Sequence, residues 1–293
     1  MNFIRWEPAI RAMFHGRPLY DASLPITSSR GVVIDPAAVF PLTDDTVPIR
    51  DFLDATGYVL LKNVFSEQEL TLFRSGAEKL KSMAKEGDNT SWWGKNQRGD
   101  AVLTRVIHAA VLAEFNRLYQ HPQVKKIEAM LPELKAMSPD EVDGVTVVYK
   151  NPAMVAGLSD LPWHRDCGLG GHAVMCPKII CSIYLYDATP AAGALKFLPG
   201  SHKASFGFMD ANDNAAPTGV TVAAKAGDVS LHYSDVMHCA PPPALGSHEY
   251  RISVLLNFDR DFQHHRGQRH YNDVLLGSED GQIDHLAKAV EKA

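Results

Sequence analysis

The stretch AGDVSLHYSDVMHCAPPP, residues 226–243, combines a predicted strand, a turn and a histidine that precedes three prolines. Residues 227–233 begin at a glycine and continue as a short run with β-branched and aromatic residues, which is typical of a strand that starts after a turn. His238 follows, and the prolines after it restrict the backbone because each one fixes its own φ. The stretch therefore predicts a β structure that presents His238 at the end of a short strand.

Four similar runs lie in the second half of the chain, separated by clusters of Gly, Pro, Asp and Asn. They are residues 144–150 (GVTVVYK), 178–186 (KIICSIYLY), 194–200 (ALKFLPG) and 251–258 (RISVLLNF). Many short strands at uneven spacing, after a helical first half, indicate an α+β chain with a β-sandwich or jelly roll. We therefore expect a mainly β core over about residues 143–260.

The first half of the chain predicts helices. A β-rich run at residues 57–65 leads into Ser66, which forms a capping box with Glu69 and starts a helix with one apolar face. Further helices are expected over residues 102–119 and 123–131, giving a helical cover over residues 66–135. We expect residues 1–50 to form an irregular arm and residues 51–293 to form a single domain.

The composition argues against several classes of protein. The 293 residues are 45% hydrophobic and 22% charged, with a formal net charge of −5. A mildly acidic chain without a Lys/Arg stripe is not expected to bind nucleic acid. No apolar run approaches the roughly 20 residues that cross a membrane, and the beginning of the sequence, with Glu7 and Pro8, does not resemble a secretory signal. We expect a cytoplasmic protein with neither a nucleic acid nor a membrane as partner.

The sequence Trp163-His164-Arg165-Asp166 contains a candidate metal site. Alternate side chains of an extended segment share a face, so His164 and Asp166 would point the same way. With a third ligand from another strand they would complete a 2-His-1-carboxylate set, which leaves open the positions that non-haem Fe(II) needs. His238 is the candidate third ligand and His232 is its rival; by itself, the H-x-D pair could be an exposed polar pair.

Arg251 and Ser253 form a second candidate site. Both lie at the start of an apolar strand, and they alternate onto one face. A guanidinium binds a carboxylate through two parallel hydrogen bonds, and the hydroxyl adds a donor. A buried arginine without such an anion would be costly. The pair predicts a site for one end of a dicarboxylate, and an ion pair between Arg251 and an internal acid is the alternative.

The order of H-x-D, a distal His and an Arg about a dozen residues later resembles the Fe(II)/2-oxoglutarate-dependent dioxygenases, and more narrowly their phytanoyl-CoA dioxygenase (PhyH-like) branch. Residues 57–70 (GYVLLKNVFSEQEL), 192–203 (AGALKFLPGSHK) and 226–243 are similar to stretches of that branch, so the resemblance spans roughly residues 52–258. It implies a double-stranded β-helix, a cupin-like jelly roll with helices packed on one side.

The resemblance also implies roles for particular residues. His164, Asp166 and His238 would bind Fe(II), and Arg251 with Ser253 would hold the distal carboxylate of 2-oxoglutarate. Asn151, with Tyr149 on its face, would steady the keto-acid end. The retained Asp166 favours hydroxylation over halogenation, because halogenating relatives replace this carboxylate by Gly or Ala.

The implied reaction is hydroxylation of a small-molecule metabolite, with O2 consumed and succinate and CO2 released. A cupin-like protein that is non-catalytic or loaded with zinc is the alternative.

Trp163, beside the first ligand, would shield the metal or line the site. Trp92 and Trp93 stand in a hydrophilic, glycine-marked stretch that we interpret as a lid or substrate wall, with simple packing as the alternative. His172 would lie near the mouth of the site or on an exposed loop.

Overall fold

Two β-sheets form the body of the protein in the computed structural model, which describes residues 25–96, 98–141, 144–151, 154–156, 161–166, 178–203, 218–244 and 251–259. The larger sheet has the order β1-β2-β12-β9-β14-β6-β4-β3-β7, with β5 paired to β14, and the smaller sheet has the order β11-β10-β13-β8. The strands of the larger sheet are β1 (Val39–Pro41), β2 (Tyr58–Lys62), β3 (Ser91–Asn96), β4 (Ala101–Val106), β5 (Lys135–Ala136), β6 (Val145–Lys150), β7 (Met154–Ala156), β9 (Ile179–Tyr184), β12 (Val229–Tyr233) and β14 (Arg251–Asp259). Those of the smaller sheet are β8 (Leu161–His164), β10 (Lys196–Phe197), β11 (Val220–Thr221) and β13 (His238–Ala240).

The chain alternates between the two sheets, as a jelly roll requires. From β8 in the smaller sheet it enters β9 in the larger one, returns to β10 and β11, crosses to β12, returns to β13 and crosses again to β14. The sheets face each other, because the ring of Phe197 in β10 stacks on that of Tyr58 in β2 with centroids 4.6 Å apart. The predicted jelly-roll core is therefore confirmed.

The central strands of the larger sheet have one face toward the helices and one toward the smaller sheet. In β6, Tyr149 donates its hydroxyl to the carbonyl of Ala77 in helix α3 (Glu67–Met83), at 2.6 Å. The register pairs Tyr149 with Ile252 of β14. Because successive side chains alternate, the neighbouring Arg251 faces the opposite way, toward the smaller sheet. The strand alternation thus separates an apolar layer beneath the helices from a polar interior between the sheets.

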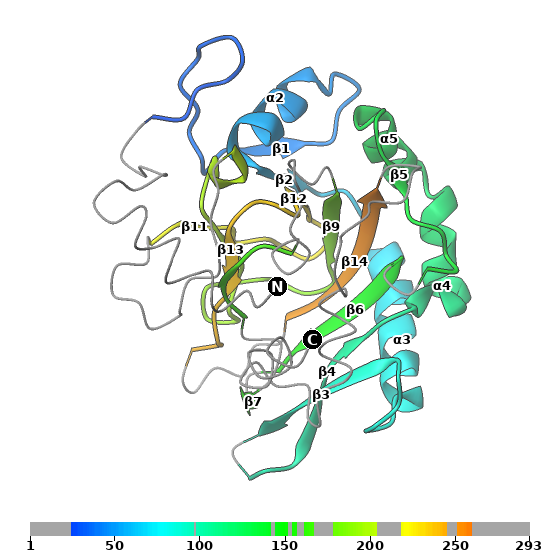
Figure 1. Cartoon of the computed structure of the whole chain (residues 1–293). Helices are drawn as coiled ribbons and strands as arrows, with labels where there is room; N and C mark the ends of the chain where they lie inside the picture. The colour runs from blue at the N-terminus through cyan, green and yellow to red at the C-terminus, as the bar shows by residue number, and fades with distance from the viewer. Residues whose placement is uncertain are drawn as a thin grey trace, which may run out of the picture.

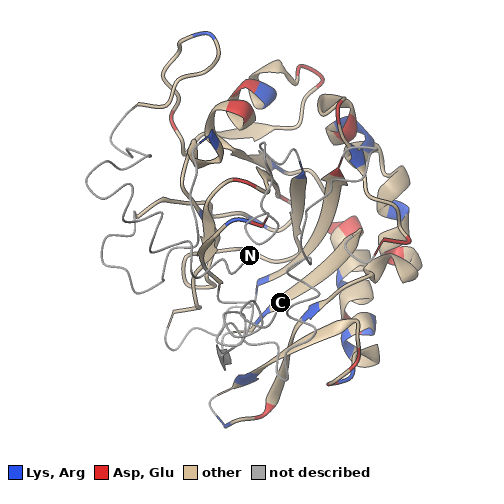
Figure 2. Ribbon diagram, in the orientation of Figure 1, with Lys and Arg blue, Asp and Glu red and all other residues tan. Residues whose placement is uncertain are grey.

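Helices cover the outer face of the larger sheet. Figure 1 shows α3, α4 (Ala113–Asn116) and α5 (Pro122–Met130) on one side of this sheet, with the smaller sheet on the other. The capping box of α3 is confirmed, since the Ser66 amide donates to Glu69 Oε2 at 2.6 Å and the Glu69 amide donates to Ser66 Oγ at 3.4 Å. Figure 2 shows basic and acidic residues interspersed along these helices. Among the described residues, none of the helices is both long enough and apolar enough to cross a membrane.

The expected helix over residues 102–119 is wrong in its first half. Residues 101–106 form β4, which pairs with β3 and with β6. Val102, Thr104 and Val106 are β-branched, and the free edge of β6 offers the hydrogen bonds that a strand needs. Only short helical turns follow: η1 (Ala109–Val111), α4 and η2 (Arg117–Gln120).

The first 50 residues are more regular than expected in their described part. β1 pairs with β2 in parallel, and helix α2 (Val47–Thr56) begins before residue 50. Pro48 near the start of α2 suits a helix N-terminus because its missing N–H would have no partner there. The arm therefore adds an edge strand and a helix to the domain.

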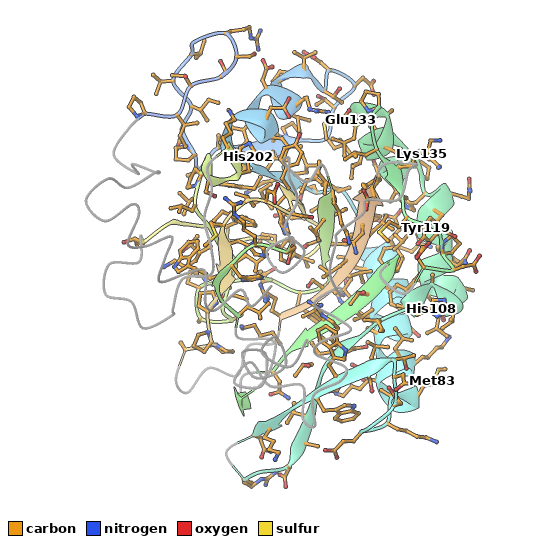
Figure 3. The ribbon with its side chains drawn as sticks, in the orientation of Figure 1. Met83, His108, Tyr119, Glu133, Lys135 and His202 are labelled. Carbon is orange, nitrogen blue, oxygen red and sulfur yellow. The ribbon has the colours of Figure 1, made fainter. Side chains whose placement is uncertain are left out.

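His202 ties the turn after β10 to helix α2. It lies in η3 (Ser201–Lys203), where Figure 3 labels it. Its Nε2 donates to the carbonyl of Asp54 at 3.1 Å. Its ring stacks on Tyr233. Gly57 makes room for the ring, because a Cβ there would lie 2.6 Å from His202 Nδ1, and its φ of +89° also favours glycine. Burial lowers the pKa of His202 to about 4.

The stability of the fold is expected to depend on pH through His202. Between its folded pKa of about 4 and its ordinary value of 6.5 the unfolded chain binds more protons, so stability falls as the pH falls through this window. Within this window the free energy of unfolding changes by at most about 1.4 kcal/mol per pH unit through this one group. Urea unfolding of wild type and His202→Gln at pH 7 and pH 5 measures this contribution. From pH 7 to pH 5 the free energy of unfolding of the variant should fall by about 2 kcal/mol less than that of the wild type. Equal decreases in the two proteins would show that His202 is not the source of the pH dependence.

Candidate metal centre and cosubstrate site

The pairing of β8 with β13 brings two histidines together. His164 ends β8, His238 begins β13, and the antiparallel register places them directly opposite each other. Opposite residues of antiparallel strands share a face, and the two imidazole centroids lie 4.2 Å apart. Both side chains are buried, with 5% of each residue exposed. Two segments far apart in the sequence therefore present their imidazoles to one point between the sheets.

Asp166 completes the cluster from the turn after β8. Its Oδ1 lies 3.6 Å from His164 Nε2, and its Oδ2 lies 3.7 Å from His238 Nε2. One potential ligand atom from each of the three residues lies within 4.8 Å of the others. Two imidazole nitrogens and one carboxylate oxygen are the donor set of non-haem Fe(II) sites, so the residues fit that metal.

Hydrogen bonds and burial prepare His238 and Asp166 for a cation. The Nδ1 of His238 donates to the carbonyl of Val236 at 3.0 Å, which leaves the Nε2 lone pair for a metal. Burial, with His164 nearby, lowers the pKa of His238 to about 3, so its ring is neutral at physiological pH. Burial disfavours charge on Asp166, but the surrounding imidazoles outweigh it and hold the pKa of its carboxyl well below the usual value. A neutral imidazole and an ionised carboxylate are the forms that bind metal.

Arg251 and Ser253 lie on the interior face of β14. Arg251 is paired in register with Lys150 of β6, and Ser253 with Val148 of β6 and Tyr184 of β9. Arg251 is 4% exposed and Lys150 is fully buried, so two cations share one face of the sheet away from water. A buried anion would offset the cost of such an arrangement.

Lys150 and Tyr184 are residues of this interior that the sequence analysis missed. Lys150 reaches across to the smaller sheet, where its Nζ donates to the carbonyl of Ala240 in β13 at 3.1 Å. The Tyr184 hydroxyl shares a hydrogen bond of 2.9 Å with Ser230 Oγ. Burial raises the pKa of Tyr184, which is thus a neutral hydroxyl, while the positive charge of Arg251 acts in the opposite direction. Strand alternation in the sequence shows only that Lys150 points opposite to Tyr149, and the contact of Tyr149 with α3 then places Lys150 on the interior face.

Other predicted site residues lie away from this interior. Tyr149 is held by α3 on the opposite face of the sheet, so its expected contact with 2-oxoglutarate is wrong. Trp163 packs in a separate buried cluster with Leu198, Met237 and Cys239, because alternation along β8 turns it away from the face that carries His164. It therefore does not shield the metal. Asn151 is half-buried directly after β6, and its role stays a prediction.

The two adjacent tryptophans are part of a strand and not of a loop. Trp92 and Trp93 lie in β3, and the guanidinium of Arg105 in β4 stacks over the Trp92 ring at 4.7 Å. Trp92 is buried, and Trp93 donates its indole N–H to Ser91 Oγ at 2.8 Å. The expected loop is therefore wrong and the strand contacts favour packing, while a place for either residue in a substrate wall stays a prediction. His172 lies outside the described residues.

Comparisons with known proteins agree with this geometry. The sequence profile of the phytanoyl-CoA dioxygenase (PhyH) family matches residues 53–243, more than half of the chain. No curated protein matches the chain significantly.

Several solved structures have the same fold. AviO1 from Streptomyces viridochromogenes Tue57 has a TM-score of 0.57 and 22% identity, over 75% of this chain and 96% of that one. SnoK, an α-ketoglutarate-dependent carbocyclase from nogalamycin biosynthesis, has a TM-score of 0.57 and 24% identity, over 75% and 87% of the two chains. EctD from S. alaskensis, solved with bound Fe, has a TM-score of 0.58 and 19% identity, over 83% and 86%.

The family match, together with the fold and the cluster between the sheets, defines the class: an Fe(II)- and 2-oxoglutarate-dependent oxygenase built on a double-stranded β-helix. Within that class, the chain belongs to the phytanoyl-CoA dioxygenase (PhyH) family.

Proposed function

We propose that the chain hydroxylates a small-molecule metabolite, with release of succinate and CO2. In this proposal His164, Asp166 and His238 hold the iron, and Arg251 with Ser253 holds the distal carboxylate of 2-oxoglutarate. The observation that carries it is the convergence of three potential ligand atoms within 4.8 Å in the same interior that contains a buried arginine. A metal-binding barrel without 2-oxoglutarate has no need of a buried carboxylate anchor.

Each protein group has a defined part in this proposal. Iron bound at the cluster supplies the activation of O2, coupled to oxidative decarboxylation of 2-oxoglutarate. Asp166 contributes a negative charge that partly balances the cation, and His238 is kept neutral and oriented through Val236. Arg251 neutralises the carboxylate of the cosubstrate in an environment that excludes water, where the ion pair is stronger than in solvent.

Asp166 favours hydroxylation over halogenation. Halogenating relatives lack a carboxylate at this position, and here it is present beside both imidazoles. SnoK is a carbocyclase and SnoN an epimerase, so the fold supports more than one oxidative outcome. Hydroxylation is the outcome that needs no feature beyond those described. We also propose a small-molecule substrate and a cytoplasmic location.

Succinate release tests the proposal directly. The protein is loaded with Fe(II) under anaerobic conditions, and a metabolite panel is then added with O2 and 2-oxoglutarate. We expect one compound class to raise succinate release well above the uncoupled background and to gain one oxygen atom by mass spectrometry. Zinc-loaded protein is the matched control and should be inactive.

Two results would contradict the proposal. Iron-loaded protein that neither consumes nor binds 2-oxoglutarate would favour the cupin-like metal-binding alternative. A product that differs from its substrate by loss of two hydrogens or by inverted stereochemistry would keep the cofactors and replace hydroxylation by desaturation, ring closure or epimerisation.

A further inference from the structure

A third histidine contacts the cluster of candidate metal ligands from the larger sheet. His232 lies in β12, only 3% exposed, and its Nε2 is 3.2 Å from Asp166 Oδ2. Asp166 belongs to the turn after β8, whereas β12 lies between β2 and β9 of the opposite sheet. This hydrogen bond therefore joins the two sheets at the candidate iron ligand.

The chemistry of the pair assigns the proton. An ionised carboxylate can only accept hydrogen bonds, so the His232 Nε2 must donate. A nitrogen that carries a proton has no lone pair for a metal. His232 is also absent from the group whose potential ligand atoms lie within 4.8 Å of one another, which consists of His164, Asp166 and His238. The remaining ring nitrogen, Nδ1, is buried and has no hydrogen-bond partner among the described residues. It therefore forms no hydrogen bond there that would favour another orientation of the ring.

Neighbouring rings hold His232 in this orientation. Its centroid lies 5.2 Å from that of Phe197 in β10 and 4.7 Å from that of His238. In the larger sheet it is paired with Tyr58 of β2 and Ile180 of β9. A donor that is packed from both sheets can fix a carboxylate at low entropic cost, because its own rotamer is already restricted.

We propose that His232 is a positioning residue that orients Asp166 for iron, and not an iron ligand. Its Nε2–H engages Oδ2, so that rotation of the carboxylate is restricted and one oxygen remains for the metal. A carboxylate that binds through a single oxygen leaves positions for the cosubstrate and O2. The inference rests on the proposed function, because it needs iron at the cluster.

Fe(II) affinity, measured anaerobically without 2-oxoglutarate, tests the proposal in three variants. His232→Ala and His232→Phe remove the donor, and Phe keeps most of the ring volume if Ala impairs folding. Both should weaken Fe(II) binding about 10- to 100-fold, the usual effect of losing a hydrogen bond to a metal ligand. His232→Gln keeps an N–H donor and should recover most of the affinity. The absorption spectrum of Co(II)-loaded protein should change in Ala and Phe and return toward wild type in Gln.

A matched control comes from another histidine–carboxylate pair. His121 Nε2 lies 2.7 Å from Glu69 Oε1, remote from the cluster, and His121→Ala should bind Fe(II) as the wild type does. Complete loss of iron in His232→Ala, as in a ligand variant, would overturn the proposal by making His232 a ligand. Unchanged affinity and spectrum, or equal weakening in Gln and Phe, would overturn it by reducing His232 to packing. Wild-type protein that binds no Fe(II) would instead reject the proposed function.

Discussion

Replacement of His238 by alanine is expected to abolish iron retention and to lower turnover by about a thousand-fold or more. Only His164 and Asp166 would then remain in the cluster, and two ligands bind Fe(II) poorly. The loss of metal catalysis removes several kcal/mol of transition-state stabilisation, at about 1.4 kcal/mol for each factor of ten. Iron content after anaerobic loading and desalting, together with succinate release, measures both effects.

The control for this variant is His202→Gln. His202 and His238 are equally buried, at 5% exposure, but the His202 ring bonds Asp54 in α2 and not the cluster. The control should retain iron in full. Thermal unfolding of both variants separates a local loss of metal from a general loss of fold. His238→Ala protein with a normal iron content would remove His238 from the ligand set and with it the site.

The cluster could be predicted from the sequence because each member has a local signal. The H-x-D motif marks His164 and Asp166, and the glycine-started strand with its proline-rich turn marks His238. The expected extended segment is only partly right: β8 ends at His164, and Asp166 lies in the following turn instead of continuing the strand. The carboxylate reaches the same point because the turn places it beside both imidazoles.

The direction in which strand residues face could not be predicted in the same way. All six residues of β6 are buried, so no exposed side marks its orientation. The sequence of a strand that is covered on both faces does not alternate between apolar and polar residues. Alternation of side-chain direction then shows that Tyr149 and Lys150 point opposite ways, but not which of the two faces the helices. The contact of Tyr149 with α3 decides between the two possibilities. Trp163 is adjacent to His164 in the sequence, but alternation along β8 turns its side chain to the opposite face, into the cluster with Leu198 and Met237.

Replacement of Arg251 by alanine is expected to weaken 2-oxoglutarate binding on the order of 100-fold, about 2.7 kcal/mol. The guanidinium lies on the interior face of β14 at 4% exposure, where a carboxylate would be desolvated and would depend on a charged partner. Iron retention should stay close to wild type, because Arg251 is not part of the cluster. Titration with 2-oxoglutarate of anaerobic Fe(II)-loaded protein measures the affinity.

Two further variants make this prediction specific to Arg251. Arg251→Lys keeps the charge but not the two parallel N–H groups, so it should recover only part of the affinity. Arg98→Ala removes a guanidinium whose side chain is 82% exposed in the turn between β3 and β4, and it should bind 2-oxoglutarate normally.

If Arg251→Ala also binds normally, then Lys150, the other buried cation on this face, becomes the candidate anchor. Lys150→Met, assayed in the same way, decides between them, because only the true anchor should lose cosubstrate affinity while keeping its iron.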